Sequence, residues 1–252
     1  MTQLEDLGTR SRRADEPAKR NSADPASAAR SRQRVVNFLL VPIVAFAAVF
    51  LIFQLPKYSS LDPNQAPRPL ESVTHYWLLV GHVATGTVAL VTVILQLWPW
   101  LRRRHPAVHR WIGRIYVFVG AIPSAIFVLL MLPVSVPAGK VGGAMAAILW
   151  AVTAVIGWER LRRRRYAEHR RWMLYSFAIL WGTPVWGFFI GMSWIWWSPW
   201  VEQVDFNYIL EGISWGGWII NLFAVQWWIE RTSGQRLRLP PGETIGSRRR
   251  RP

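Results

Sequence analysis

Six long apolar segments, separated by short polar or strongly basic ones, dominate this sequence. A helix needs about 20 mostly apolar residues to cross a bilayer, and each segment approaches that length. None shows a strong strand-like alternation of apolar and polar residues, and each is too long for one buried strand. We therefore predict an all-α fold, a polytopic transmembrane helical bundle of six spans, with five or seven as the alternatives. The predicted spans are residues 35–55, 75–98, 115–134, 141–158, 172–192 and 208–229.

The domain organisation is set by these segments. Residues 1–34 are rich in Arg, Ser, Ala, Asp and Pro, and such a composition buries too little surface to offset the entropy of ordering. They are predicted to form a disordered basic tail. Residues 35–230 form the bundle, and residues 231–252 form a second basic tail.

Lysine and arginine are distributed very unevenly. Of the 30 in the chain, 27 lie in the two tails and in the segments 99–114 and 159–171. With six spans, all four regions fall on one side of the membrane, and only Lys57, Arg68 and Lys140 fall on the other. Cytoplasmic loops carry the excess of basic residues, so both termini are predicted to be cytoplasmic and the protein to reside in the cell (inner) membrane of a bacterium.

The net charge of +16 would suggest nucleic-acid binding in a soluble protein. Here apolar spans divide the arginines, so they cannot form one basic face. The predicted partners are anionic lipid headgroups, whose attraction for each basic residue contributes about 1 kcal/mol. Nucleic acid is not predicted as a partner. The absence of cysteine excludes disulfides and zinc sites built on thiolates. The sequence shows none of the phosphate-binding, dinucleotide, nucleophile-elbow or metalloprotease motifs, so an enzymatic activity stays undecided.

Two small-xxx-small patterns occur in the last two spans. They are Gly187 with Gly191 and Gly212 with Gly216. Small residues allow membrane helices to approach closely. We predict that these two spans touch each other through them, and a homodimer through either pair is the alternative.

Ionisable residues inside the bilayer are functional candidates because each is costly unless paired. His75 and His82 share one helical face with Gln96, at spacings of 7 and 14 residues. Glu211 lies one turn inside the last span. These positions predict a polar cluster of His75, His82 and Glu211 near the outer surface.

A second set of histidines lies at the basic side. "HRWIGRIY" and "HRRWMLYS" each place a His-Arg pair at the foot of a span, so His109 and His169 are predicted to lie at one depth on two helices. His105, beside Pro106, is interpreted as a loop residue. Neutral imidazole is a good ligand for haem iron and also suits a proton relay. His82, His109 and His169 are therefore the candidate haem or proton-relay residues, with no metal other than haem iron.

The stretch "GHVATGTVALVTVILQLWPWLRRRHPAVHRWIGRIYV", with "AEHRRWMLYSFAIL" further along the chain, resembles the bacterial membrane-protein family called domain of unknown function 2306. The resemblance covers about residues 74–190. Its elements are His82, Gln96, Pro106, His109, Arg110, Gly113, Arg114, Tyr116, His169, Arg170, Trp172 and Met173. It implies a multi-pass membrane protein without an assigned activity. This family usually has an arginine where Tyr175 stands, which puts in doubt any role of that position toward an anionic ligand.

Three functions are compatible with these residues. The first is a redox protein that binds haem b through His109 and His169, with His82 near an outer site. The second is a small-molecule or proton-coupled transporter that uses His82 and Glu211. The third is a non-catalytic membrane scaffold.

Overall fold

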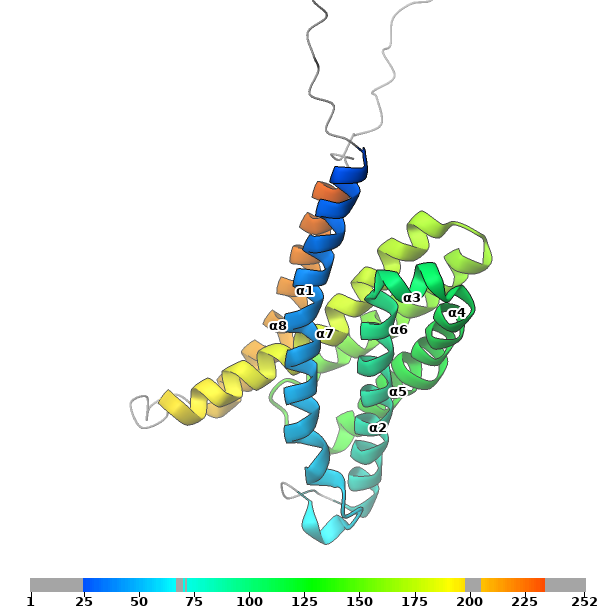
Figure 1. Cartoon of the computed structure of the whole chain (residues 1–252). Helices are drawn as coiled ribbons and strands as arrows, with labels where there is room; N and C mark the ends of the chain where they lie inside the picture. The colour runs from blue at the N-terminus through cyan, green and yellow to red at the C-terminus, as the bar shows by residue number, and fades with distance from the viewer. Residues whose placement is uncertain (1–24, 67–69, 71, 198–204, 234–252) are drawn as a thin grey trace, which may run out of the picture. The chain divides into compact units, whose positions relative to one another are not determined.

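The computed structural model describes residues 25–66, 70, 72–197 and 205–233, and within these ranges all regular secondary structure is helical (Figure 1). Six helical segments are long and apolar enough to cross a membrane, which confirms the predicted six-span helical bundle. They are Leu40–Tyr58, Val73–Leu97, Pro106–Val134, Lys140–Arg162, Tyr166–Ile190 and Phe206–Arg231. Residues 1–42 and 43–252 form two separate units, and the contacts described below lie within the second.

The helices succeed one another with short connections. Their bounds are α1 Pro25–Gln54, α2 Val73–Leu97, α3 Pro99–Arg104, α4 Pro106–Ile115, α5 Ile122–Met131, α6 Lys140–Arg162, α7 Tyr166–Trp197 and α8 Phe206–Ser233. Three short 3₁₀ turns accompany them, η2 Leu55–Tyr58, η3 Pro63–Gln65 and η5 Leu132–Val134. A π-helical segment, η4 Tyr116–Ala121, joins α4 to α5, so the third span is one continuous rod with an irregular centre.

The helices begin earlier than the sequence predicted, and the difference is largest for α1 and for the third span. Helix α1 starts at Pro25, so residues 25–34 are helical where composition predicted disorder, while residues 1–24 lie outside the described part. Helix α4 starts at Pro106 rather than near residue 115. Proline suits the first helical position because its missing N–H would have no partner there. Apolarity alone did not predict that residues 106–114 are helical. Arg110 and Arg114 are exposed there, on a helix that continues beyond the apolar core.

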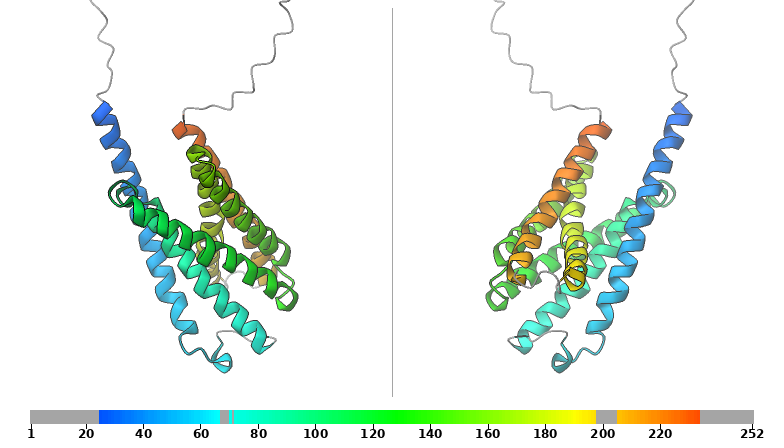
Figure 2. Two further views of the ribbon diagram at one scale, coloured as in Figure 1. Left: turned by 90° about the vertical axis from the view of Figure 1, so that its right-hand side faces the viewer. Right: turned by 90° about the vertical axis from the view of Figure 1, so that its left-hand side faces the viewer.

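Helix α2 packs against α4, η4 and α5, while α7 packs against α6 and α8. Figure 2 shows α7 and α8 side by side in both views. Close approach depends on glycine at several crossings, of which two show it clearly. A Cβ at Gly120 would lie 2.8 Å from the Cα of Ala89 in α2, and one at Gly182 would lie 2.7 Å from the backbone of Trp218 in α8. The backbones therefore touch directly at both crossings.

The last two spans do touch, but not through the glycines predicted. The close contact is between Gly182 and Gly217, where a Cβ at Gly217 would lie 2.9 Å from the Gly182 carbonyl oxygen. A Cβ at Gly187 would meet only Ile213, at 3.8 Å. A Cβ at Gly212 would meet nothing within 4 Å, and one at Gly216 would reach only Ile220 of its own helix. Gly191 has no described environment. The spacing of small residues is present, but α8 is oriented so that Gly212 and Gly216 do not face α7. The homodimer alternative stays a prediction.

Candidate functional site

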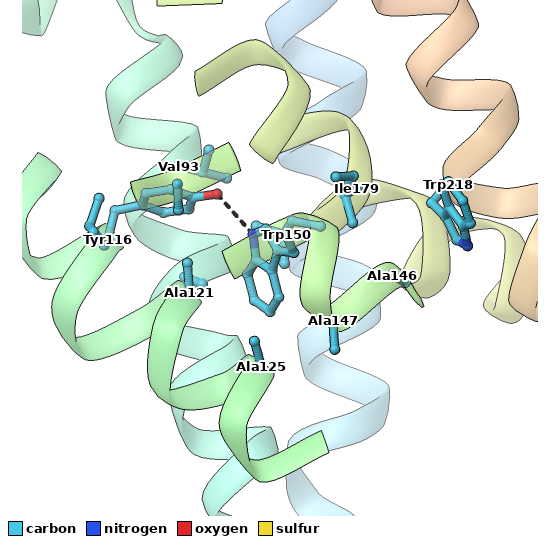
Figure 3. Packing of buried hydrophobic residues seen from close by; sticks show 13 residues of the cluster. Val93, Tyr116, Ala121, Ala125, Ala146, Ala147, Trp150, Ile179 and Trp218 are labelled. Atoms are coloured by element: carbon cyan, nitrogen blue, oxygen red, sulfur yellow. Dashed lines mark hydrogen bonds between the residues drawn. The ribbon is translucent and has the colours of Figure 1, made fainter. Parts of the chain in front are cut away.

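Three polar side chains from three helices meet in the core of the bundle. Trp150 of α6 donates its indole N–H to the hydroxyl of Tyr116, over 3.1 Å, and Figure 3 shows this bond. The same hydroxyl lies 2.6 Å from the Oγ of Ser176 in α7. Tyr116 and Ser176 are completely buried. We call Tyr116, Trp150 and Ser176 the polar triad. Since buried polar groups are costly without partners, the triad fixes how the three helices are rotated against one another.

The polar triad sets the register of a second layer toward the basic end. His109 precedes Tyr116 by seven residues, and His169 precedes Ser176 by seven. On α6, which runs in the opposite direction, Gly157 comes seven residues after Trp150. Residues seven apart lie on the same helical face, with an axial separation of about 10 Å. The same spacing places His109, His169 and Gly157 at one level of the bundle, and we call these three residues the histidine layer.

The contacts of His169 agree with this register. Its Nδ1–H donates to the carbonyl oxygen of Gly157, over 2.7 Å. A hydrogen bond from Nδ1 to a backbone carbonyl fixes the tautomer and leaves Nε2 as the unprotonated nitrogen that can bind a metal. A Cβ at Gly157 would lie 2.7 Å from the sulfur of Met173, so glycine lets α7 lie close to α6 at this level. His169 is thus held in the orientation typical of a metal-ligating histidine.

His109 occupies the opposite side of the layer on α4. Its carbonyl oxygen accepts a hydrogen bond from the Nε2 of Gln96 in α2, over 2.6 Å. Its Nδ1 is buried and has no hydrogen-bond partner among the described residues. His169, Arg102 and Arg110 all act electrostatically on the His109 ring. The described contacts thus hold His169 against α6 and the backbone of His109 against α2, and the pairing of the two imidazoles stays a prediction.

Two other predicted residues have clear surroundings. His105 is the exposed residue before α4, and its ring lies 4.8 Å from that of Trp100 between centroids. Gln96 sits on the predicted face of α2, but it binds the α4 backbone rather than another polar side chain. Its amide helps to hold α4 against α2 at the level of His109.

His82 lies deeper in the bundle and contacts α5. Its Nδ1 lies 2.9 Å from the Oγ and 3.2 Å from the carbonyl oxygen of Ser124. Ser124 is completely buried and comes directly after Pro123 and the π-helical segment. His75 lies two turns earlier on the same face of α2. It is buried, and its Nδ1 has no hydrogen-bond partner among the described residues. The His82–Ser124 contact therefore joins α2 to the irregular part of the third span.

Glu211 was predicted to cluster with His75 and His82, but its hydrogen bonds go to other residues. One of its carboxylate oxygens accepts the backbone N–H of Gly139, the residue before α6, and the other accepts the indole N–H of Trp215, over 2.9 Å. Gly139 has a φ of +79°, which glycine adopts at no steric cost. The glutamate thus stabilises the start of α6, where negative charge is favourable. The sequence did not predict this contact, because Gly139 lies 72 residues from Glu211 along the chain.

Replacing Glu211 by alanine should lower the stability of the bundle. The change leaves the Gly139 and Trp215 N–H groups without their acceptor, which costs about 1–3 kcal/mol for a buried donor. Thermal unfolding of the detergent-purified protein would measure it. Glu211→Gln is the matched control, because it keeps one oxygen acceptor and should lose clearly less. Equal melting of the alanine variant and the wild type would contradict the capping role.

The position of Tyr175 bears on the family's arginine. Its hydroxyl accepts from the Nε of Arg171, over 2.7 Å, and donates to the Oε1 of Gln226, over 2.5 Å. A guanidinium therefore lies next to this position even though tyrosine occupies it. Arg171 stands one helical turn before Tyr175, so positive charge is present at this part of α7.

The polar triad was missed as a site from the sequence, although Tyr116 belongs to the family-like pattern. A signal for two of its members was present, since a hydroxyl side chain stands seven residues after each of the two histidines. Trp150 had no such signal, because nothing in the apolar α6 sequence marks which of its faces is buried. Within the described residues no group of three or more His, Cys, Asp or Glu side chains is placed to hold a metal ion. The histidine layer offers two imidazoles only.

Residues 79–229, more than half of the chain, match the family described as "Predicted membrane protein (DUF2306)". The match includes both layers and the helices that form them. A search of curated proteins and a search of solved structures each gave no match. The chain is a multi-pass membrane protein and belongs to the DUF2306 family.

Proposed function

We propose that this protein binds one haem b between α4 and α7, through His109 and His169, and carries electrons within the membrane. The observation that supports this most directly is the histidine layer itself. Two imidazoles from two helices share one level, His169 has its Nδ1 hydrogen occupied by Gly157, and His109 has an unpartnered buried nitrogen among the described residues. A haem held between helices needs one imidazole from each side.

The chain's own residues fit the group in two further respects. Arg102 and Arg110 place positive charge near His109, which suits the anionic propionates of a haem. The polar triad below the layer is fully bonded and holds the three helices at a fixed rotation, so the imidazoles are positioned by rigid elements. When bound, haem b supplies a one-electron carrier whose potential depends on its axial ligands and on burial.

His82 is not included in this proposed site. Its Nδ1 is engaged by Ser124, and the other imidazole of α2, His75, lies on the same helix. His75 and His82 lie seven residues apart on one face of α2, so they cannot supply imidazoles from two helices. The proposal therefore involves a single haem at the basic end of the bundle.

Optical spectra of the purified protein test this proposal. Protein from haem-replete cells should show a Soret band, with a sharp α-band after dithionite reduction, and His109→Ala with His169→Ala should abolish both. His105→Ala is the matched control, because this histidine lies at the same end but outside the layer, and should leave the spectrum unchanged. A colourless wild-type protein, or a spectrum retained by the double variant, would contradict haem binding at this site.

A proton-coupled or small-molecule transporter is the second candidate. The His82–Ser124 contact supports it, because it places an ionisable group inside the bilayer beside a π-helical segment and Pro123. Interrupted helices often line the binding sites of transporters, and π-helical turns are frequent at functional sites. Glu211 offers less support, since its carboxylate caps α6. A colourless protein would favour this candidate, or a scaffold that binds partners through its basic loops.

The orientation and location are part of the same proposal. We propose that the basic end, with α3, the start of α4 and the α6–α7 connection, faces the cytoplasm, and that the membrane is the bacterial cell membrane. The concentration of 27 of 30 lysines and arginines in the four basic regions supports this. The histidine layer would then lie close to the cytoplasmic surface.

A further inference from the structure

A groove of about 490 Å³ lies between α6, α7 and α8. Its walls include Leu149 and Thr153 of α6, Trp172 and Ile179 of α7, and Leu222 and Phe223 of α8. The hydroxyl of Thr153 is turned back to carbonyl oxygens of its own helix. The accessible surface of the groove is therefore apolar. Since all three helices are membrane spans, the groove suits a hydrocarbon chain.

One end of the groove is polar and positively charged. Tyr175 and Gln226 lie there, and the Arg171 guanidinium bonds both of them, to the tyrosine hydroxyl over 2.7 Å and to the glutamine Oε1 over 3.3 Å. These two bonds use two of the five N–H groups of the guanidinium. Arg171 is also exposed at the surface. Its remaining N–H groups are therefore able to reach an acceptor outside the protein.

Charged residues of both signs follow on α8. Arg231, in the last turn of α8, is exposed, and its guanidinium lies 4.3 Å from the centre of the Trp227 ring. The Gln226 amide in turn donates to Glu230 over 2.5 Å. Carboxylates of the α6–α7 connection are engaged by its own arginines, since Glu168 pairs with Arg160 and Arg165. An anion at the end of the groove would thus meet Arg171, with the Glu230 carboxylate held on the amide of Gln226 beside it.

We propose that this groove is a binding site for one anionic phospholipid, with an acyl chain along α6, α7 and α8 and its phosphate at Arg171. The apolar walls match the chain, and a guanidinium matches a phosphate through paired hydrogen bonds. The inference rests on the groove and its charged end alone. It does not depend on haem binding.

Native mass spectrometry of the detergent-purified protein, titrated with phosphatidylglycerol or phosphatidylcholine, tests the site. The wild type should retain one phosphatidylglycerol molecule in preference to phosphatidylcholine. Arg171→Gln should weaken phosphatidylglycerol binding about fivefold, the effect expected of one basic residue on an anionic headgroup, with little effect on phosphatidylcholine. Ile219→Trp, which fills the groove, should weaken both.

Matched controls separate the groove from general effects. Arg114→Gln removes an exposed arginine near Trp111, outside the groove, and Val152→Trp enlarges an exposed position of α6 that is not part of its walls. Both should bind like the wild type. Equal retention of the two lipids by the wild type, or equal losses in Arg171→Gln and Arg114→Gln, would overturn the proposal. Recovery of a bound isoprenoid quinone that phosphatidylglycerol does not displace would also overturn it, by identifying a different occupant.

Discussion

Gly182→Ala should strongly destabilise the bundle. The added Cβ would lie 2.7 Å from the Cα and N of Trp218 and 2.8 Å from the carbonyl carbon of Gly217. These are backbone atoms, so no side chain can swing aside to make room, and α7 and α8 would have to separate. Overpacking of this kind costs about 1–3 kcal/mol, occasionally more. The melting temperature in detergent and the yield of monodisperse protein should both fall.

Gly143→Ala and Gly212→Ala are the matched controls for this experiment. A Cβ at either position meets nothing within 4 Å. Alanine is favoured over glycine within a helix by about 0.5–1 kcal/mol, so both variants should be as stable as the wild type or slightly more stable. If these variants lose as much stability as Gly182→Ala, the cost does not come from the crossing of α7 and α8.

Tyr116→Phe should produce the second large effect. The change removes a hydroxyl that accepts from Trp150 and bonds Ser176 at complete burial. The indole N–H is then left without an acceptor, at a cost of about 1–3 kcal/mol. The free energy of unfolding, measured by denaturant titration in detergent, should fall by this amount. Tyr116→Phe should cost more than Ser176→Ala, because Ser176→Ala still leaves Trp150 with its acceptor.

A double-mutant cycle between Tyr116→Phe and Ser176→Ala tests the pair itself. The two groups are in direct contact, at 2.6 Å, so their effects should not add. The double variant should lose clearly less than the sum of the single variants. Additive losses would mean that the two hydroxyls do not interact in the folded protein, and the register of the histidine layer would then lack its anchor.

Much of the fold was accessible from the sequence because the bilayer imposes strong rules. Length and apolarity identified six spans, and the repeated His-Arg at the foot of two of them predicted that His109 and His169 share a level. That pairing stays a prediction, and the structure adds a contact that neither sequence context contains, the bond from His169 to Gly157.

The rest depended on how each helix is rotated about its axis. In a soluble helix a polar face reveals the buried face, but α6 and α7 are apolar on nearly all sides within the membrane, so the inward positions of Trp150 and Gly182 had no marker. The role of Glu211 depended on a left-handed residue, Gly139, at the start of another helix. The π-helical segment was also unforeseen, because Pro123 predicts only a kink.

That π-helical segment divides the third span into two parts that both pack against α2 but make different polar contacts. At its first residue, Tyr116 bonds Trp150 of α6 and Ser176 of α7, and after it, Ser124 meets His82 of α2. One residue of an α-helix corresponds to a rotation of about 100°, so a single extra residue acts as a phase shift between the turns on its two sides. A relative with one residue fewer here would keep its histidine layer and lose the His82 contact. Insertions and deletions at this point would therefore uncouple two sites without altering any residue of either.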